Sequence, residues 1–446
     1  MRSIAATTDG WRGLPGPAWA EPHLLAALDH CATQQALGNS VLIGYDGRAG
    51  ARELAHLAAD LLTTRGITCH LATSPAPTPA LGHLVHTRTD LSAAVIVTAS
   101  HNPPGYIGIK LRNHTGHGIQ WPQPSEQRWV DPGQLPHHDH PAIDALAPYA
   151  GSVGAGLCAA ADRFDGDVLL DAAHGAVGAL APHLPALTVV RARPLPFFAG
   201  HTPDPVPRTH AKTTARALLS RARHPHRTLL ALTDGDGDRL VLFTHRSGYI
   251  GSPEQAAALL HSGLPVERLI TTLVAPRMAV RAAEYARPGL RVTETPVGFK
   301  HIVAAWHTDP APALGLEPNG ALVHARNAND YFERDSLAAL AFLLRAFPTL
   351  AELDDAVTEV RTRYPHAQLV HTTPVPLPDV LTALPQFLPG WNSELSQELA
   401  IYDDGAHGRI AVRASGTEPG TRLYIEAPLP VAEQITTALG AVTPSA

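Results

Sequence analysis

Cysteine is scarce in this sequence. Cys31, Cys69 and Cys158 are the three cysteines among 446 residues, and no two of them are closely spaced. An odd number of distant cysteines does not form a paired disulfide framework and lacks the spacing of a zinc site. We therefore exclude a small secreted disulfide-rich fold and expect a protein of the reducing cytoplasm.

Long apolar runs and excess positive charge are also missing. No stretch of 18 apolar residues occurs, and Asp9, Trp11 and Arg12 interrupt the N-terminal region where a signal peptide needs an unbroken apolar core. The formal net charge is −6, from 34 Lys and Arg against 40 Asp and Glu, which is not typical of a general nucleic-acid binder. These absences predict a soluble cytoplasmic protein with neither a membrane nor a nucleic acid as partner.

The remaining composition is that of a folded multidomain protein. Hydrophobic residues make up 45% and charged residues 17% of the chain, which excludes a disordered or fibrous protein. The length predicts three or four domains of about 100 to 150 residues each. Apolar runs alternate with helical patterns, which indicates mostly parallel sheets flanked by helices. We expect strands over 41–43, 67–72, 92–98, 167–170, 228–232, 268–273, 314–316, 368–371, 399–402, 409–413 and 423–427, and helices over 52–64, 214–222, 253–260 and 336–347.

The stretch TASHNPPGYIGIK, residues 98–110, has the features of a reactive loop. Ser100 lies where a short apolar strand gives way to a tight turn. Such places commonly hold reactive groups, because the strand fixes the position and the loop leaves the side chain accessible. Ser100 is therefore a candidate nucleophile, with His101 as proton carrier and Lys110 as nearby cation. Serine and asparagine are also ordinary turn residues, so a plain turn is the alternative.

A second strand end carries three carboxylates in TDGDGDR, residues 233–239. Glycines alternate with Asp234, Asp236 and Asp238, so the carboxylates can approach one point, where they repel one another unless a cation lies among them. Oxygen ligands of this kind suit a hard ion such as Mg²⁺. An acidic surface turn is the alternative, but the position at a strand end and the adjoining Arg239 favour a catalytic metal. The distal glutamate of an EF-hand is missing.

The loop RASGTEPGTR, residues 413–422, has the pattern of a phosphate site. Backbone N–H groups through Ser415, Gly416 and Thr417 can form a nest for an anion. Arg413 and Arg422 stand at either end of this turn. We expect phosphate binding here rather than a plain hairpin loop.

Several other short stretches give weaker indications of binding residues. In EPNG, Glu317 and Asn319 follow a predicted strand, and an exposed Glu and Asn there suit either sugar hydroxyls or an ordinary turn. Arg12, in TDGWRG, either reaches a phosphate or is a solvated loop residue. Lys300 lies beside the turn in TPVGFKHI. Within the Pro- and His-rich stretch 113–156, the histidines of residues 137–140 indicate a solvated linker rather than a metal site.

In this order, TASHNPPGYIGIK, DGDGDR and RASGTEPGTR resemble the serine, metal and phosphate loops of the α-D-phosphohexomutase superfamily. The superfamily contains phosphoglucomutases, phosphomannomutases and phosphoglucosamine mutases, and the resemblance covers essentially the whole chain. It implies three successive α/β domains with mixed sheets sandwiched by helices, plus a C-terminal α+β domain, around a central cleft. The implied limits are 1–150 with the phosphoserine loop, 151–251 with the metal loop, 252–360 with the sugar loop, and 361–446 with the phosphate loop.

The resemblance also implies a role for each motif. Ser100 would carry the transferred phosphate as phosphoserine and would share Mg²⁺ with the three aspartates. Lys110 or His101 would act as the base for the incoming hydroxyl. Arg12, Lys110 and Arg239 would surround the reacting phosphate. The substrate would be bound by Glu317, Asn319, Lys300, Arg413, Ser415, Gly416, Thr417 and Arg422.

The implied reaction interconverts hexose 1-phosphate and hexose 6-phosphate. A hexose 1,6-bisphosphate would be both intermediate and activator, and Mg²⁺ the cofactor, in a monomer or homodimer. TPVGFKHI and TDGWRG are similar to the phosphoglucomutase/phosphomannomutase branch, which favours glucose or mannose phosphates.

The sequence departs from the family pattern at three places. Ile107 replaces a usual asparagine, Asn319 with Pro318 changes the sugar loop, and Ala321 stands where some relatives carry histidine. A phosphoglucosamine mutase and a catalytically idle sugar-phosphate-binding relative are therefore the alternatives. A serine hydrolase is disfavoured because no Gly-x-Ser-x-Gly elbow surrounds Ser100.

Overall fold

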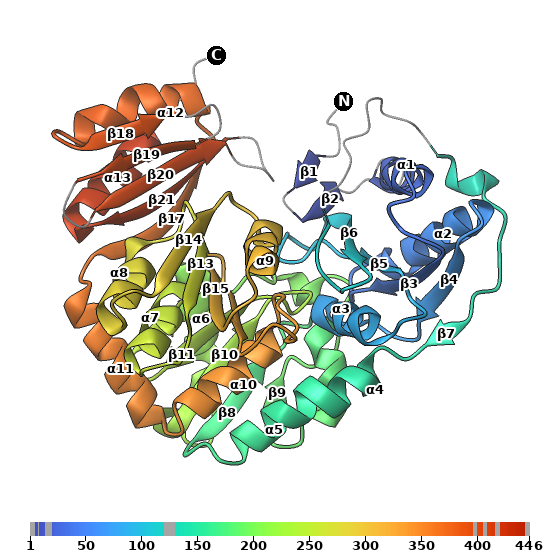
Figure 1. Cartoon of the computed structure of the whole chain (residues 1–446), viewed down its shortest axis with the longest axis horizontal. Coiled ribbons are helices and arrows are strands. Elements are labelled where there is room, and N and C mark those ends of the chain that lie inside the picture. The colour runs from blue at the N-terminus through green and yellow to red at the C-terminus, as the bar shows by residue number, and fades with distance from the viewer. Residues whose placement is uncertain are drawn as a thin grey trace.

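The computed structural model describes residues 5–7, 9–13, 20–119, 130–395, 399–404, 408–414 and 420–441. Within these residues the chain forms four sheets, each built from a separate section of sequence, so four structural units follow one another along the chain. Figure 1 shows the first unit and the fourth unit on opposite sides of the second and third.

The first sheet has seven strands in the order β1-β2-β6-β5-β3-β4-β7. Its central strands β5, β3 and β4 are parallel, whereas β6 and β2 run antiparallel to their neighbours. The strands are β1 (Ala5–Thr7), β2 (Gly10–Gly13), β3 (Ser40–Tyr45), β4 (Thr68–Ala72), β5 (Ala93–Val97), β6 (Ile107–Asn113) and β7 (Ala142–Ile143). Helices α1 (Ala20–Thr33) and α2 (Ala51–Thr64) cover one face, and α3 (Thr78–Thr87) covers the other.

The second sheet has the order β12-β11-β10-β8-β9. Strands β9, β8 and β10 are parallel, and β11 and β12 continue as antiparallel hairpins. Their bounds are β8 (Asp167–Asp171), β9 (Thr188–Val190), β10 (Thr228–Thr233), β11 (Leu240–Thr244) and β12 (Gly248–Ile250). The helices of this section are α4 (Leu146–Tyr149), α5 (Ala155–Ala161) and α6 (Arg208–Leu219).

The third sheet has the order β14-β13-β15-β16, with only the β15–β16 hairpin antiparallel. Its strands are β13 (Arg268–Thr272), β14 (Arg291–Thr295), β15 (Ala313–Glu317) and β16 (Ala321–Ala325). Its helices are α7 (Ser252–His261), α8 (Arg277–Ala286), α9 (Phe299–Thr308), α10 (Ser336–Ala346) and α11 (Leu350–Arg363).

The fourth sheet is antiparallel throughout, in the order β17-β21-β20-β19-β18. Its elements are β17 (Ala367–Thr373), α12 (Leu377–Ala383), β18 (Asn392–Leu395), β19 (Leu399–Asp403), β20 (Arg409–Ala414), β21 (Thr421–Ala427) and α13 (Leu429–Ala441). This unit has its own apolar core, to which residues from β19, β20, β21 and α13 contribute. Three mixed α/β units and a C-terminal α+β unit confirm the expected fold class.

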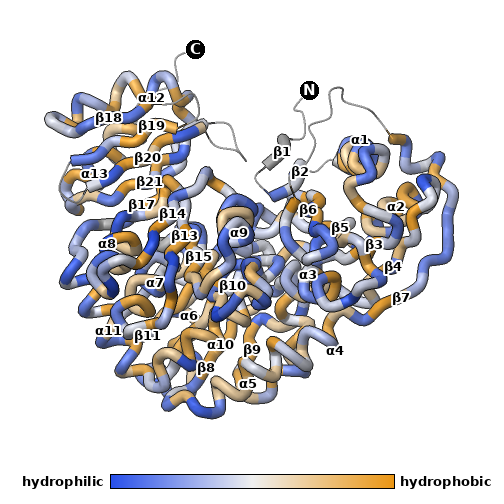
Figure 2. The backbone as a smooth tube through the Cα atoms, viewed as in Figure 1, coloured by the Kyte–Doolittle hydropathy of each residue, from blue (hydrophilic) through white to orange (hydrophobic). Residues whose placement is uncertain are grey.

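One large apolar core links the first three units. It extends from the inner face of the first sheet through the second and third sheets to α11. In Figure 2 the hydrophobic residues gather on the strands of the sheets, in agreement with this core. None of the helices in the described part of the chain is long and apolar enough to cross a membrane.

Several local predictions were wrong. The α6 helix begins at Arg208 rather than at residue 214, and the antiparallel strands β6, β11 and β16 were not expected. Helix α11 was also missed, although Thr349 and Glu352 form a capping box at its start, with each residue bonded to the other's backbone N–H.

Residues 130–156, the described part of the predicted linker after residue 119, also differ from the expectation. Helix α4 begins among them at Leu146. The ring of His140 is buried and lies 2.9 Å from the carboxylate of Asp60, which also accepts the N–H of His138. This part of the stretch therefore packs on α2 rather than forming a solvated linker.

A buried histidine between the first and third units makes folding stability depend on pH. His117 follows β6, and its ring Nδ1 lies 2.8 Å from the Thr115 hydroxyl and 3.4 Å from His307 of α9. Burial, the largest influence, lowers the pKa of His117 to about 4, although Glu333 opposes the shift. Below its ordinary pKa near 6.5 the unfolded chain binds a proton that the folded protein does not, so stability is lost as pH falls.

We expect the free energy of unfolding to fall by about 3 kcal/mol through this group between about pH 7 and about pH 4. Urea unfolding of wild type and His117→Asn at both pH values measures it, because the variant should lose less stability on acidification by that amount. His114→Asn is the matched control, since His114 is exposed three residues away. Equal acid sensitivity in wild type and His117→Asn would contradict the prediction.

Candidate active site

Ser100 lies at the C-terminal end of β5, where the structure holds it in an unusual conformation. Its φ is +50°, in the left-handed region that residues with a Cβ seldom adopt. The side chain is 1% exposed, and its Oγ donates a hydrogen bond to Asp234 Oδ2 at 2.7 Å. Strand β10 of the next unit delivers Asp234, so the serine loop and the carboxylate loop meet across two units.

The three aspartates converge as expected. Asp234, Asp236 and Asp238 are buried, and each offers one oxygen within 4.8 Å of the others. The Oδ1 of Asp234 accepts the backbone N–H groups of Gly237, Asp238 and Arg239, which closes the loop around it. Gly237 has a φ of +77°, a conformation that glycine adopts without strain. The alternation of Asp and Gly therefore builds a compact acidic loop.

Lys110 supplies positive charge inside this acidic loop. Its Nζ lies 2.7 Å from Asp236 Oδ2, 2.8 Å from Asp238 Oδ2 and 2.9 Å from Asp9 Oδ2. Burial by itself lowers the pKa of Lys110, but these three carboxylates raise it above the ordinary value. Lys110 is therefore a permanently charged ammonium in this site.

The triad fits a divalent cation. Burial, and then the charges of Asp238 and Asp236, raise the pKa of Asp234 well above its usual value, so a third negative charge in the cluster is disfavoured unless a further cation joins it. Asp236 Oδ1 and Asp238 Oδ1 are buried and have no hydrogen-bond partner among the described residues. Unpaired carboxylate oxygens at this spacing are a suitable ligand set for Mg²⁺.

Arg12 and His101 lie close to each other beside the serine loop. Arg12 donates to Asn102 Oδ1 at 2.6 Å, and its guanidinium lies 3.5 Å from His101 Nδ1. His101 Nδ1 is also 3.5 Å from Ser100 Oγ. Burial lowers the pKa of His101 well below its usual value, and the charges of Arg239, Arg12 and Arg422 lower it further, so the ring is neutral.

The predicted sugar loop is less exposed than expected. Glu317 is 3% exposed rather than exposed, because its Oε1 accepts the N–H of Gly298 at 3.0 Å and its Oε2 accepts Asn319 Nδ2 at 3.0 Å. Asn319 Oδ1 is left without a partner among the described residues, so it can accept a hydrogen bond from a ligand. Lys300 lies half-buried at the start of α9, and burial lowers its pKa.

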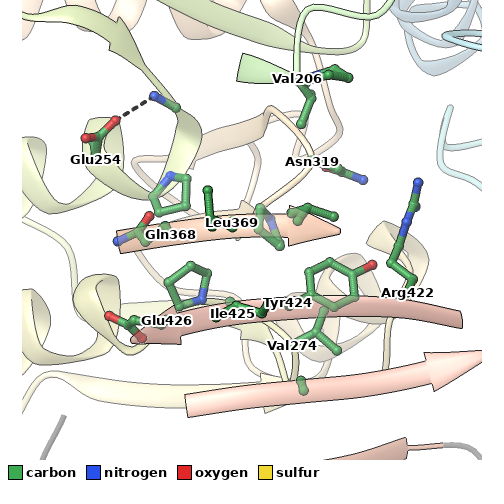
Figure 3. A pocket seen from close by; sticks show the side chains of 18 of the residues that line it. Val206, Glu254, Val274, Asn319, Gln368, Leu369, Arg422, Tyr424, Ile425 and Glu426 are labelled. Carbon is green, nitrogen blue, oxygen red and sulfur yellow. Dashed lines mark hydrogen bonds between the residues drawn. The ribbon is translucent and has the colours of Figure 1, made fainter. Parts of the chain in front are cut away.

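A cavity of about 330 Å³ extends from this loop to the fourth sheet. Figure 3 shows Asn319 and Arg422 at one end of it, with Glu254, Gln368 and Glu426 at the other. Arg239 also lines the cavity, and a guanidinium nitrogen of Arg239 lies 3.8 Å from Asp234. The cavity thus joins the acidic loop, the sugar loop and β21.

Comparisons with known proteins agree with this arrangement. The family model described as Phosphoglucomutase/phosphomannomutase, alpha/beta/alpha domain I matches residues 4–128, and that of the C-terminal domain matches residues 377–435. Phosphoglucosamine mutase of Burkholderia vietnamiensis is 27% identical over 445 residues, which are 94% of each chain. The structure of a putative phosphomannomutase from Thermus thermophilus aligns with a TM-score of 0.75 at 22% identity, over 98% of each chain. Parafusin, a phosphoglucomutase from Paramecium, aligns over the full length of both chains with a TM-score of 0.71 at 16% identity.

These matches support the α-D-phosphohexomutase superfamily, because family models of its phosphoglucomutase/phosphomannomutase type match two parts of the chain and relatives align over nearly all of it. The expected superfamily is thereby confirmed, and the enzyme class that it implies is an isomerase acting by phosphoryl transfer. The branch within the superfamily is not decided by these likenesses, since the family models match the phosphoglucomutase/phosphomannomutase type whereas the first curated relatives are phosphoglucosamine mutases.

The predicted phosphate loop is only partly within the described residues. Ser415, Gly416 and Thr417 lie outside them. Arg413, at the end of β20, donates to the Tyr424 hydroxyl at 3.1 Å and to the Ala414 carbonyl, so it remains on its own sheet. Arg422 lines the cavity and lies 3.4 Å from Thr372 Oγ1.

The candidate active site around Ser100 and the three aspartates contains further charged residues that the sequence patterns did not identify. Asp9 binds Lys110, Arg112 and Arg334, and Arg334 also lies 3.3 Å from Asp238. No motif marked Arg334, which comes from the loop before α10. Asp46 and Arg48, in GYDGR after β3, contact the serine loop, and their position at a strand end was the available signal.

Proposed function

We propose that this phosphohexomutase interconverts a hexose 1-phosphate and a hexose 6-phosphate through a phosphoserine at Ser100 and a hexose 1,6-bisphosphate. The observation that carries the proposal is the contact between Ser100 Oγ and Asp234 Oδ2 at 2.7 Å, inside a buried carboxylate triad. A serine hydroxyl held against a metal-type ligand set is suited to accept and return a phosphoryl group.

Asp234, Asp236 and Asp238 would hold Mg²⁺ together with an oxygen of phospho-Ser100. When bound, the ion would neutralise negative charge on the transferred phosphoryl group. Arg12 and Arg239 flank the serine and would orient the phosphate by forked hydrogen bonds. These roles rest on the proximity of the residues to Ser100.

Of the two candidate bases, His101 is favoured over Lys110. Lys110 is charged because three carboxylates raise its pKa, so it has no free lone pair to accept a proton. His101 is neutral and lies 3.5 Å from Ser100 Oγ. His101 would accept the proton of the incoming sugar hydroxyl, and Lys110 would act as a fixed positive charge.

The substrate would lie between the sugar loop and the fourth unit. Glu317, Asn319 and Lys300 would contact the sugar ring, and Arg413 with residues 415–417 and Arg422 would bind the phosphate that is not transferred. The domains that carry these loops would span residues 1–150, 151–251, 252–360 and 361–446. The fourth domain, with its own core, would move to let the bisphosphate reorient.

Glucose or mannose phosphates are the proposed substrates. Glucosamine phosphate is the second candidate, because phosphoglucosamine mutases are the curated relatives that match 94% of this chain. Asn319 is compatible with both kinds of substrate, because its Oδ1, which has no partner among the described residues, can accept a hydrogen bond from a sugar hydroxyl or from the ammonium group of glucosamine.

A coupled assay tests the proposal. Conversion of glucose 1-phosphate, mannose 1-phosphate and glucosamine 1-phosphate is measured with Mg²⁺ and a trace of the matching 1,6-bisphosphate, and again with excess EDTA. We expect turnover of at least one sugar and its loss in EDTA, and the ranking of kcat/KM identifies the branch. No turnover of any sugar by folded protein phosphorylated at Ser100 would contradict the proposal and favour an idle binder or an unusual sugar.

A further inference from the structure

Arg48 is a buried arginine whose two terminal guanidinium nitrogens both bind the serine loop. It follows β3 and is 4% exposed. Its Nε binds Asp46 at 3.0 Å. The two terminal nitrogens donate to four backbone carbonyls, those of Ser100, Asn102, Pro103 and Tyr106. One guanidinium therefore holds the whole turn that follows Ser100.

The Asp46–Arg48 pair fixes both peptide groups that flank the Ser100 Cα. The Ser100 N–H donates to Thr98 Oγ1 at 2.9 Å, and that hydroxyl donates to Asp46 Oδ2 at 2.7 Å. On the other side, Arg48 binds the Ser100 carbonyl. A left-handed backbone at a non-glycine residue costs on the order of 1 to 3 kcal/mol and persists only where its surroundings hold it. These two anchors are what hold Ser100 at a φ of +50°.

The same carbonyl faces the acidic loop of the second unit. A Cβ placed on Gly235 would lie 2.6 Å from the Ser100 oxygen, so only glycine allows the two loops to approach this closely. The Phe198 ring, also from the second unit, lies 4.8 Å from the Arg48 guanidinium carbon. Arg48 thus contacts the second unit at the point where Ser100 meets Asp234.

We propose that Arg48 is a positioning residue for phosphoryl transfer, which holds Ser100 in the strained conformation that directs its Oγ to the carboxylate triad. It acts through Ser100 rather than through the substrate, because its side chain is fully buried. The inference rests on the proposed mutase function, and it assigns a role to a residue outside the serine, metal, sugar and phosphate motifs.

The test measures how fast Ser100 takes a phosphoryl group from a hexose 1,6-bisphosphate, by intact-protein mass spectrometry, in wild type, Arg48→Met and Arg48→Lys. We expect Arg48→Met to react about 100-fold more slowly, the effect of a displacement near 1 Å at a reacting atom. Arg48→Lys should be intermediate, because an ammonium group cannot reach four carbonyls at once. KM for the hexose 1-phosphate should stay within about threefold, since ground-state binding is untouched.

Arg52→Met is the matched control, because Arg52 is exposed at the start of α2. Hydrogen exchange of the amides of residues 101–106 is a second readout that needs no activity, and it should accelerate in Arg48→Met but not in Arg52→Met. Added ethylguanidinium should partly restore the phosphorylation of Arg48→Ala, which a general loss of folding would not allow.

If wild-type Ser100 takes no phosphate, the proposed function fails, and hydrogen exchange then decides the role of Arg48. Phosphorylation of both Arg48 variants at the wild-type rate, or unchanged exchange in Arg48→Met, overturns the inference.

Discussion

Replacement of Ser100 with alanine is expected to lower mutase turnover by about 10⁴-fold or more. In the proposed reaction Ser100 Oγ carries the phosphoryl group in both half-reactions, and removal of a covalent nucleophile typically costs on the order of 10⁴ to 10⁶ in kcat. Thr78, at the start of α3, also bonds to the triad, but its hydroxyl donates to Asp236 rather than to Asp234. The measurement is kcat for the hexose 1-phosphate that the wild type converts fastest.

The fold should tolerate this change. Ser100→Ala loses one hydrogen bond to Asp234, which corresponds to about 1 kcal/mol in the free energy of unfolding. Ser220→Ala is the control for a hydroxyl on the surface, because Ser220 is exposed and its hydroxyl donates to the carbonyl of Ala217. Mass spectrometry should find phosphoserine in wild type and Ser220→Ala and none in Ser100→Ala. Retention of more than about a tenth of the activity by Ser100→Ala would exclude Ser100 as the phosphate carrier.

Replacement of Lys110 with methionine is expected to lower the free energy of unfolding by about 3 to 5 kcal/mol in the absence of Mg²⁺. Methionine keeps the volume of the side chain but removes the cation that lies within 3 Å of Asp9, Asp236 and Asp238. The buried carboxylates of Asp236 and Asp238 and the partly buried carboxylate of Asp9 then lose their shared cation. Removal of one partner of a buried ion pair leaves the remaining charge unpaired, which is strongly destabilising. Turnover should also fall by about 10² to 10³, because a fixed charge near the transferred phosphate is lost.

Urea unfolding with and without Mg²⁺ measures this effect. A cation bound to the triad stabilises the folded protein by mass action, about 2.7 kcal/mol at 100 times its Kd, so Mg²⁺ should recover part of the loss in Lys110→Met. Lys212→Met is the matched control, because Lys212 is exposed on α6. A change of less than about 1 kcal/mol in Lys110→Met would show that Lys110 does not neutralise the triad.

The core of the site could be predicted because its signals are local. The Asp–Gly alternation at 234–238 places three carboxylates near one point whatever surrounds them, and the end of an apolar strand places Ser100 at an edge of a sheet. Strands β5 and β10 both end at the interface between the first two units, so the two loops meet. The four-unit fold was predictable from the order of three motifs, and the structure confirms it.

Other features depend on contacts between distant segments, which no local pattern records. Glu317 was expected to be exposed, but it is buried because the N–H of Gly298, 19 residues earlier, binds it. Asp9 and Arg334 lie 325 residues apart and meet only when the first and third units pack together. The partners of Lys110 could not be predicted either, because Asp236 and Asp238 belong to another unit and no spacing along the chain relates them to this lysine.

The sequence by itself determined which chemistry this protein contains: the serine, the three carboxylates and the arginines, each in a short motif whose residue types fix its reactivity. Only the tertiary structure decided how those groups are tuned. Packing of the first unit against the second placed Ser100 on Asp234, and folding of the first unit itself set Arg48 over the serine loop. The surrounding carboxylates favour the charged form of Lys110, whereas burial favours the neutral form of His101. The reason is physical, because burial and charge pairing depend on which distant side chains exclude water from a group, and that is a property of the folded chain.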